Sequence, residues 1–233
     1  MSDHTDWTDM SESSEIENLI GQAQQAWSAG DTEAAIHCWQ QGARLGDAQC
    51  AYNLGVLLDE GQHLPRDAAG AAHWYRQAAN AGFPDAAFNL AVLHEQGDGV
   101  MQDANEAARW FHFAAERGNA QAMFNLGLKF DEGRGLPQDA EQAAQWYLLA
   151  AESGEGRGAA NLARLFAMGE GVERSDVSAF KWYAIAAEMG VASAARYRER
   201  VARELTPDQR LHAGERAQEW LRNHATAGSA RLQ

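Results

Sequence analysis

Residues 85–118 read DAAFNLAVLHEQGDGVMQDANEAARWFHFAAERG, and the key residues of this stretch return every 36 positions along the chain. The repeated positions are Asn53, Asn89, Asn125 and Asn161; Leu54, Leu90, Leu126 and Leu162; Ala71, Ala107, Ala143 and Ala179; and Trp74, Trp110, Trp146 and Trp182. A fixed period of this length is typical of stacked copies of one small unit, and such stacks present extended binding surfaces.

Each copy divides into two helices, which we term A and B. Residues 85–96 carry apolar residues at helical spacing, and Gly97 ends this A helix where a left-handed backbone is needed. Asp103 stands where an N-cap side chain accepts a backbone N–H of the B helix. The periodic tryptophans of the B helices are expected in the core, filling the space between neighbouring helices.

The period also sets the expected domain organisation. We predict a disordered acidic tail at 1–15, a partial first copy at 16–46, and four full copies at 47–190. Two helices at 191–222 are expected to cap the stack, and 223–233 is expected to be a flexible tail. The N-cap and first-turn proline of Thr206-Pro207-Asp208-Gln209 mark the start of the last helix.

Over about residues 21–190 the repeated pattern closely resembles the Sel1-like repeat (SLR) family. The resemblance rests on N-L-A at 89–91, G-D-G-V at 97–100 and A-A-R-W-F at 107–111, with the same motif in the other copies. It implies an all-α, right-handed α-solenoid of helix-turn-helix repeats, related to tetratricopeptide repeats, that acts as an adaptor for proteins or peptides. The chain departs from the family pattern at Leu58, Leu93 and Phe130, at Gly61-Gln62-His63, and at Ser175.

Charge is distributed unevenly over the chain. Of the net charge of −14, the first twenty residues supply −6, the segment 191–233 supplies +3, and the repeats between them hold −11. An acidic array is a poor nucleic-acid binder, so we expect a protein or peptide partner of basic character. No apolar stretch is long enough for a membrane span, and the polar start is unlike a signal peptide. We therefore expect a cytoplasmic protein without membrane insertion.

The expected partner-binding surface is the concave side that helix A lines in tetratricopeptide relatives. Residues one turn apart on helix A share one face. The predicted partner-binding residues are Asn53, Asp59, Glu60, Asp85, Asn89, Glu95, Asn125, Asp131, Glu132, Arg157, Asn161 and Arg164. Two alternatives stay open: the repeated asparagines link neighbouring helices, or the acidic residues form only a solvated face.

The sequence shows no catalytic constellation and no metal or cofactor motif. His94-Glu95 lacks the second histidine of a zinc helix, and the glycine pairs such as Gly97 and Gly99 recur at the repeat period, so turn geometry explains them. Cys38 and Cys50 are too few for a disulfide framework, and we expect reduced thiols, with pairing across the turn between them left open.

Two functions from different classes remain. The first is an adaptor that holds a basic or mixed-polarity protein segment in its groove. The second is a stoichiometric inhibitor, such as the immunity protein of a bacterial toxin. Self-assembly through the repeat face is a third possibility, although a monomer is favoured.

Overall fold

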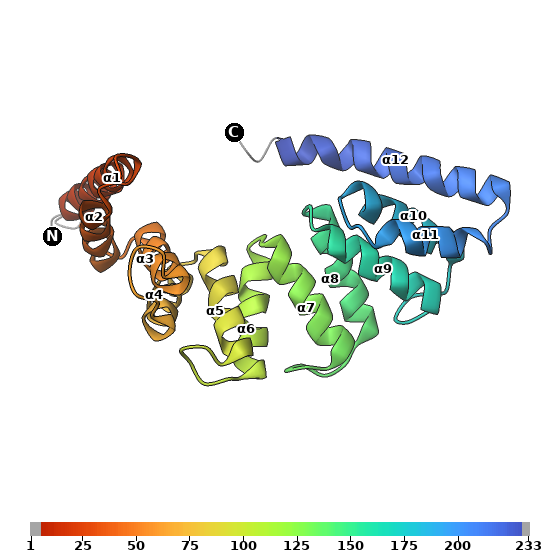
Figure 1. Cartoon of the computed structure of the whole chain (residues 1–233), viewed down its shortest axis with the longest axis horizontal. Coiled ribbons are helices and arrows are strands. Elements are labelled where there is room, and N and C mark those ends of the chain that lie inside the picture. The colour runs from red at the N-terminus through yellow and green to blue at the C-terminus, as the bar shows by residue number, and fades with distance from the viewer. Residues whose placement is uncertain (1–5, 230–233) are drawn as a thin grey trace. The chain divides into compact units, whose positions relative to one another are not determined.

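The computed structural model describes the backbone of residues 6–229, which form twelve α-helices and no strand (Figure 1). Helices α2 to α10 are each 13 residues long, as expected for a regular repeat. The helices are α1 (Asp6–Ser28), α2 (Thr32–Arg44), α3 (Ala48–Glu60), α4 (Ala68–Asn80), α5 (Pro84–Gln96), α6 (Ala104–Glu116), α7 (Ala120–Glu132), α8 (Ala140–Glu152), α9 (Gly156–Met168), α10 (Asp176–Glu188), α11 (Ala194–Ala202) and α12 (Pro207–Ser229). The predicted all-α architecture of helix-turn-helix repeats is confirmed.

The helix boundaries follow the local signals in the sequence. Gly97 ends α5 in the left-handed conformation, with φ of +72°, and the A helices α3, α7 and α9 end in the same way. The Asp139 carboxylate accepts the backbone N–H of Gln142 over 3.0 Å at the start of α8. Backbone and side-chain hydrogen bonds between Thr206 and Gln209 form a capping box at the start of α12.

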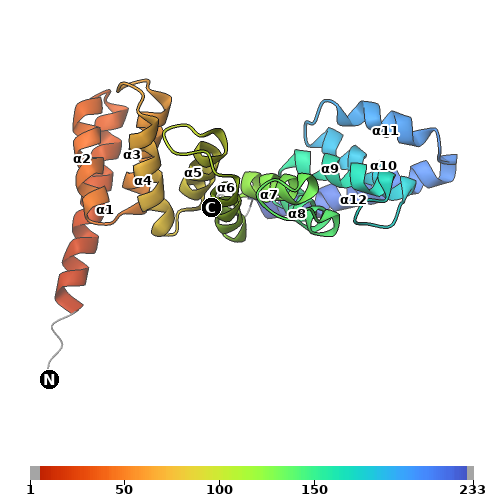
Figure 2. The same cartoon turned by 90° about the horizontal axis from the view of Figure 1, so that it is seen from below.

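The chain forms two compact units, residues 1–110 and 111–233. In the first unit α1 packs on α2, α2 on α3, α3 on α4, and α4 on α5. Figure 2 shows α1 to α4 side by side. In the second unit α7, α8, α9 and α10 pack in the same sequential manner, and α10 also contacts α11 and α12. Each unit therefore carries its own series of packed helices.

The core is formed by small residues and by one aromatic residue of each B helix. In the B helices of the four full copies, the aromatic position that is fully or almost fully buried throughout holds Tyr75, Phe111, Tyr147 and Tyr183. The tryptophans directly before the first three are only half-buried, so the prediction that they fill the core is wrong for Trp74, Trp110 and Trp146. In α4, Ala71, Tyr75 and Ala78 are spaced by four and three residues and share the inward face. The tryptophan one position earlier points away from that face.

Trp182 is the exception, because a capping helix covers it. Its ring lies 5.4 Å from that of Trp220 on α12, in an edge-to-face arrangement. The predicted pair of C-terminal capping helices is confirmed as α11 and α12, both of which pack on α10.

Small side chains let successive helices approach closely, and the α2–α3 pair of the first unit and the α8–α9 pair of the second achieve this differently. In the first unit Gly42 of α2 faces Cys50 of α3, where an added Cβ on Gly42 would lie 2.6 Å from the Cys50 Sγ. In the second unit Gly158 of α9 faces α8, where an added Cβ would lie 2.6 Å from the Tyr147 carbonyl oxygen and 2.8 Å from the Ala150 Cβ.

Both cysteines are free thiols. Cys50 is buried and Cys38 half-buried. Burial is the main cause that raises the pKa of the Cys50 thiol to about 12, and the Asp47 carboxylate raises it further.

The helices at both ends of the chain extend further than the sequence predicted. Helix α1 begins at Asp6, although disorder was predicted for residues 1–15, and no glycine or proline interrupts the sequence before Gly21. Helix α12 continues to Ser229, although a flexible tail was predicted from residue 223. The remaining parts of the two predicted tails, 1–5 and 230–233, lie outside the described residues.

Helix α11 keeps the register of the repeats, which the sequence analysis missed. The buried Ala194 stands 36 residues after Gly158, and Tyr197 and Arg200 stand 36 residues after Asn161 and Arg164. We therefore assign α11 as the A helix of a further, incomplete copy.

Candidate partner-binding site

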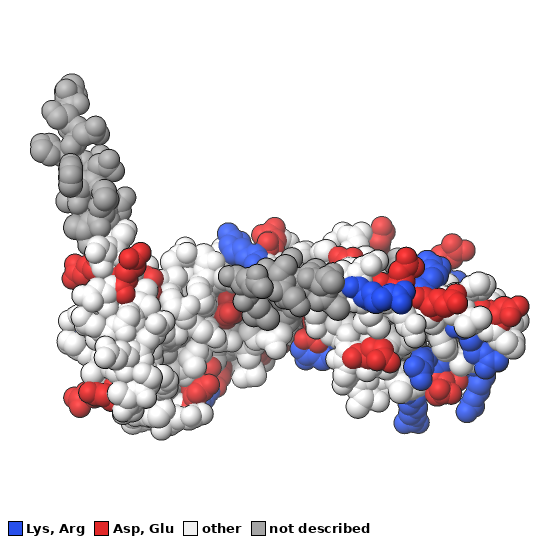
Figure 3. Space-filling view, turned by 90° about the horizontal axis from the view of Figure 1, so that it is seen from above, with Lys and Arg blue, Asp and Glu red and all other residues white. Residues whose placement is uncertain are grey.

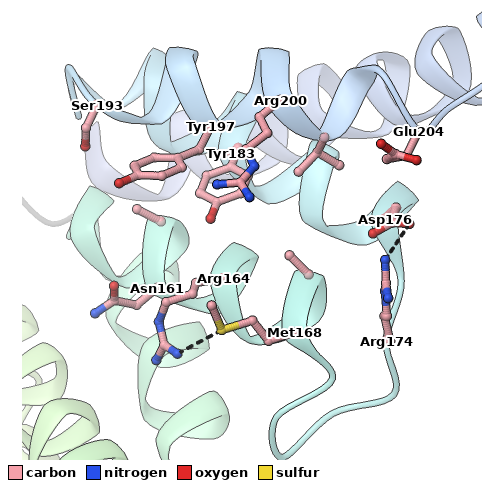
Figure 4. A pocket seen from close by; sticks show the side chains of 13 residues that line it. Asn161, Arg164, Met168, Arg174, Asp176, Tyr183, Ser193, Tyr197, Arg200 and Glu204 are labelled. Carbon is pink, nitrogen blue, oxygen red and sulfur yellow. Dashed lines mark hydrogen bonds and ion pairs between the residues drawn. The ribbon is translucent and has the colours of Figure 1, made fainter.

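The second unit contains a cavity of about 580 Å³ between α9, α10 and α11 (Figure 4). Asn161, Arg164 and Met168 line it from α9, while Tyr197 and Arg200 face them from α11. Two of the predicted binding residues, Asn161 and Arg164, thus lie on one wall of a cavity. The opposite wall is formed by the residues that occupy the same two repeat positions one period later.

Aromatic surface lies next to the guanidinium groups of this cavity. The rings of Tyr183 and Tyr197 are stacked, with centroids 5.6 Å apart and an angle of 20° between their planes. Tyr197 is 47 % exposed, and Met168 on the other wall is 60 % exposed. Such surfaces bury well against apolar or planar groups of a partner.

The three arginines of the cavity differ in their ion pairs. Arg164 pairs with Asp131 and, over 2.7 Å, with Glu170. Arg174 lies 3.5 Å from the Asp176 carboxylate, as Figure 4 shows. Arg200 has no ion pair within the described part of the chain, so its guanidinium is available to a partner carboxylate or carbonyl group.

Two of the four repeated asparagines contact a tyrosine of the preceding B helix. Burial raises the pKa of Tyr147 most, the Asp131 carboxylate raises it further, and a hydrogen bond with the Asn161 amide opposes these effects. The Tyr147 hydroxyl donates to Asp131 over 3.0 Å. Burial, followed by the Asp59 carboxylate, likewise raises the pKa of Tyr75, and a hydrogen bond with the Asn89 amide lowers it. For these two positions the structure supports the alternative that asparagine links neighbouring helices.

Asn53 and Asn125 have different hydrogen bonds, because the aromatic residue at the corresponding position lacks a hydroxyl group. These aromatics are Trp39 and Phe111. The Asn53 side chain instead accepts from the Gln49 amide over 3.0 Å, and the Asn125 amide donates to a carbonyl of its own helix. The identity of one core aromatic therefore decides whether the repeated asparagine is engaged between helices.

The predicted acidic groove is largely neutralised within the protein. Asp59 pairs with Arg66 over 3.1 Å and accepts from the Tyr75 hydroxyl over 3.4 Å, and Asp131 pairs with Arg164. Further predicted residues are also engaged: Glu132 pairs with Arg134, Arg157 pairs with Glu155, and Asp85 and Glu95 both take part in interactions. Long arginine side chains that reach back from the loops or from the next helix explain this difference from the expectation.

Glu60 differs from these acids, because it forms no ion pair among the described residues. Together with Asn53 it lines a second, smaller cavity of the first unit, between α1, α2 and α3. Four of the predicted residues thus line cavities, Asn53 and Glu60 in the first unit and Asn161 and Arg164 in the second.

Tyr197 and Arg200 were missed by the sequence analysis. The signal that could have found them is their distance of 36 residues from Asn161 and Arg164. It was overlooked because the arginine-rich segment after Gly190 was interpreted only as a cap.

Two further features bear on the class of site. Among the described residues, no group of three or more His, Cys, Asp or Glu side chains is placed to hold a metal ion. Of the helices that the structure describes, none combines the length and the apolar character that a bilayer crossing requires.

These observations define a helical repeat protein with a cavity between successive A-type helices, and sequence comparison identifies its family. The Sel1 repeat matches residues 27–47, 48–83, 84–119, 120–155 and 156–191. The chain belongs to the Sel1 repeat family, as the resemblance predicted. Proteins of this family generally mediate interactions between proteins.

Solved structures support the same assignment. A Sel1 repeat protein from Oxalobacter formigenes is 28 % identical, with a TM-score of 0.73 over 88 % of this chain and 83 % of that chain. A protective antigen with an SLR fold from uropathogenic Escherichia coli strains is 26 % identical, with a TM-score of 0.59 over 97 % of this chain and 58 % of that chain. No curated protein matches the chain.

Proposed function

We propose that this protein is an adaptor that binds a segment of another protein on the exposed faces of its A helices, without catalysing a reaction. The observation that carries this proposal is the cavity between α9 and α11, because equivalent repeat positions line both of its walls. Asn161 and Arg164 face Tyr197 and Arg200 there, so the cavity is built from the repeat itself.

The chemistry of the cavity suits a peptide segment. The unpaired Arg200 guanidinium offers several N–H donors to backbone carbonyl groups or to a carboxylate, and the Tyr197 ring offers a flat apolar surface. No histidine or cysteine is among the residues that line this cavity, which favours binding over catalysis.

We further propose that the partner is basic where it contacts the first unit. That unit holds 17 acidic and four basic residues, for a net charge of −13, so it attracts cationic segments at low ionic strength. The second unit, with its arginine-lined cavity, is expected to contact polar or acidic groups of the partner.

The proposal is tested by affinity capture from the source cell, followed by titration calorimetry with the purified partner. Arg200→Glu should weaken binding at least about tenfold, because it reverses a charge that no ion pair among the described residues engages. Arg210→Glu on α12 is the matched control, because Arg210 is also exposed but lies outside the cavity. Unchanged affinity of the Arg200→Glu protein would contradict the proposed site.

The same experiment separates the adaptor from the inhibitor. An adaptor leaves the activity of the captured protein intact, whereas an immunity protein abolishes the activity of one toxin at a ratio of one to one. Abolished toxin activity would therefore replace the adaptor assignment with the second function.

A further inference from the structure

The smaller cavity of the first unit has a chemistry that the larger one lacks. It has a volume of about 380 Å³ and lies between α1, α2, α3 and the loop that follows α3. Its walls include Trp27, Trp39, Tyr52, Glu60 and His63. We term this cavity the front pocket.

Aromatic rings form much of the front pocket. The Trp27 ring lies 5.3 Å from that of Trp39, at an angle of 48°, and 4.9 Å from that of His63, in an edge-on arrangement. Trp27 is 39 % exposed and Trp39 only 7 %. Trp39 therefore belongs to the buried floor, and Trp27 leaves part of its ring accessible to a ligand.

A single unpaired carboxylate stands beside these rings. Glu60 is the exposed last residue of α3 and has no ion-pair partner within the part of the chain that the structure describes. Its neighbour Asp59 is already engaged by Arg66. The proximity of Glu60 to the aromatic wall is seen in Tyr52, whose pKa is raised mainly by burial and also by the Asp85 and Glu60 carboxylates.

The front pocket lies where the partial first copy and the first full copy depart from the repeat. Trp39 occupies the position of Tyr75 and Tyr147 in later copies, and His63 occupies the position of Gly99. In the second full copy this position requires glycine, because an added Cβ on Gly99 would lie 2.2 Å from the Ala68 backbone. Regular packing therefore accounts for a buried aromatic ring at Trp39 but not for the histidine that stands in place of glycine at His63.

We propose that the front pocket binds an arginine or lysine side chain of the partner protein. A cation is attracted to the face of tryptophan more strongly than to other aromatic rings, and Glu60 supplies an opposite charge at the same opening. The negative charge of the first unit increases the local concentration of such a ligand. This inference rests on the proposed adaptor function and specifies the group that the first unit recognises.

The test uses two short glycine–serine peptides, one with a central arginine and one with citrulline, its neutral isostere. Binding is followed through the tryptophan indole N–H signals in two-dimensional NMR spectra, with Trp27→Leu used to assign the Trp27 signal. The arginine peptide should shift the Trp27 and Trp39 signals in a saturable manner, whereas the citrulline peptide should leave them in place.

Charge variants decide whether the pocket or the general acidity of the unit is responsible. Glu60→Gln should weaken binding of the arginine peptide about three- to tenfold, since it removes a direct ion pair. Glu17→Gln removes the same charge from an exposed position of α1 outside the pocket and should leave the affinity unchanged. Equal losses in the two variants, or equal binding of arginine and citrulline, would overturn the inference.

The outcomes also separate this inference from the adaptor function. If a captured partner is lost with Arg200→Glu but retained with Glu60→Gln, and the arginine peptide shifts no indole signal, the adaptor stands and the front-pocket proposal fails. If the arginine peptide binds as expected but no partner is captured, the front pocket stands as a cation site and the adaptor function fails.

Discussion

The two units share one repeat and differ sharply in charge. Residues 1–110 hold 17 acidic and four basic residues, for a net charge of −13. Residues 111–233 hold 16 acidic and 15 basic residues, for a net charge of −1. In Figure 3 positively charged side chains are few over the first unit and frequent over the second. The shared core of alanines and aromatics specifies the fold, so the surface charges of each unit are left to determine binding.

The core contacts between helices also differ. Where the first unit pairs Gly42 with Cys50, the second pairs Ala150 with Gly158, so the smaller residue changes sides. The surroundings of the two glycines differ as well: Gly42 faces the Cys50 side chain, while Gly158 also faces backbone atoms.

The largest expected difference in stability is between substitutions of these two glycines. Gly158→Ala should destabilise the protein by about 2–3 kcal/mol, because the added methyl group meets the Tyr147 carbonyl oxygen, which cannot move independently. Gly42→Ala should cost less than about 1 kcal/mol, because the Cys50 Sγ can shift and alanine favours a helix. Urea-induced unfolding followed by circular dichroism measures both.

The controls for this pair are glycines without close neighbours. Gly21→Ala in α1 and Gly214→Ala in α12 place a methyl group where no atom lies within 4 Å, and each should stabilise its helix by about 0.5–1 kcal/mol. A Gly158→Ala protein as stable as the Gly214→Ala protein would show that the contact with α8 is not tight.

The second expected difference in stability is between substitutions of two ion-paired arginines. Arg164→Gln should cost about 1–2 kcal/mol, because it leaves Asp131, whose side chain is only 17 % exposed, without its cation. Arg66→Gln should have a clearly smaller effect, because Arg66 and both of its acidic partners are more exposed to water. Thermal unfolding of the two variants checks this order, and equal losses would contradict it.

Added salt should stabilise the first unit more than the second, because screening relieves the repulsion among the excess acidic residues of the first unit. The difference in stabilisation should be less than about 1 kcal/mol. Hydrogen exchange at low and high sodium chloride concentration resolves the two units in one sample. Protection should rise with salt mainly in α2 to α5, and a uniform rise along the chain would argue against this explanation.

At alkaline pH we expect the two units to lose the same stability contribution from their buried tyrosines. Burial raises the pKa of Tyr75 in the first unit and of Tyr147 in the second above the ordinary value of 10.0. The unfolded chain then loses its tyrosine protons first, so the stability contribution is complete below pH 10 and is lost as the pH rises towards the folded-state pKa. Ultraviolet titration of Tyr75→Phe and Tyr147→Phe should show equal losses of late-titrating tyrosine.

Much of the fold could be predicted from the period, because glycine stops, aspartate caps and alanine spacing are local signals. The choice between Trp74 and Tyr75 as the core residue was missed, although both repeat at the same period. Only the rotation of the helix separates them, because they stand three and four residues after Ala71 and both spacings fit one face. The buried pairs Ala71-Ala72 and Ala78-Ala79 are centred on Tyr75 and not on Trp74.

The candidate site was less accessible to prediction. The face of helix A was inferred from the resemblance to tetratricopeptide repeats, and helical spacing grouped Asn161 and Arg164 on that face. In the structure both line the cavity wall. The ion pairs of Asp59 and Asp131 could not be deduced, because they depend on where flexible arginine side chains from other segments settle. The roles of the asparagines depend on a hydroxyl group on another helix, which a periodic pattern does not display.

Helix α11 has a structural consequence beyond the residues it adds to the cavity. Because the array ends with half a copy, the last complete copy packs against one more A-type helix, α11. A terminal half-unit of this sort completes the inter-helix cleft that a stack cut between copies would leave with one wall.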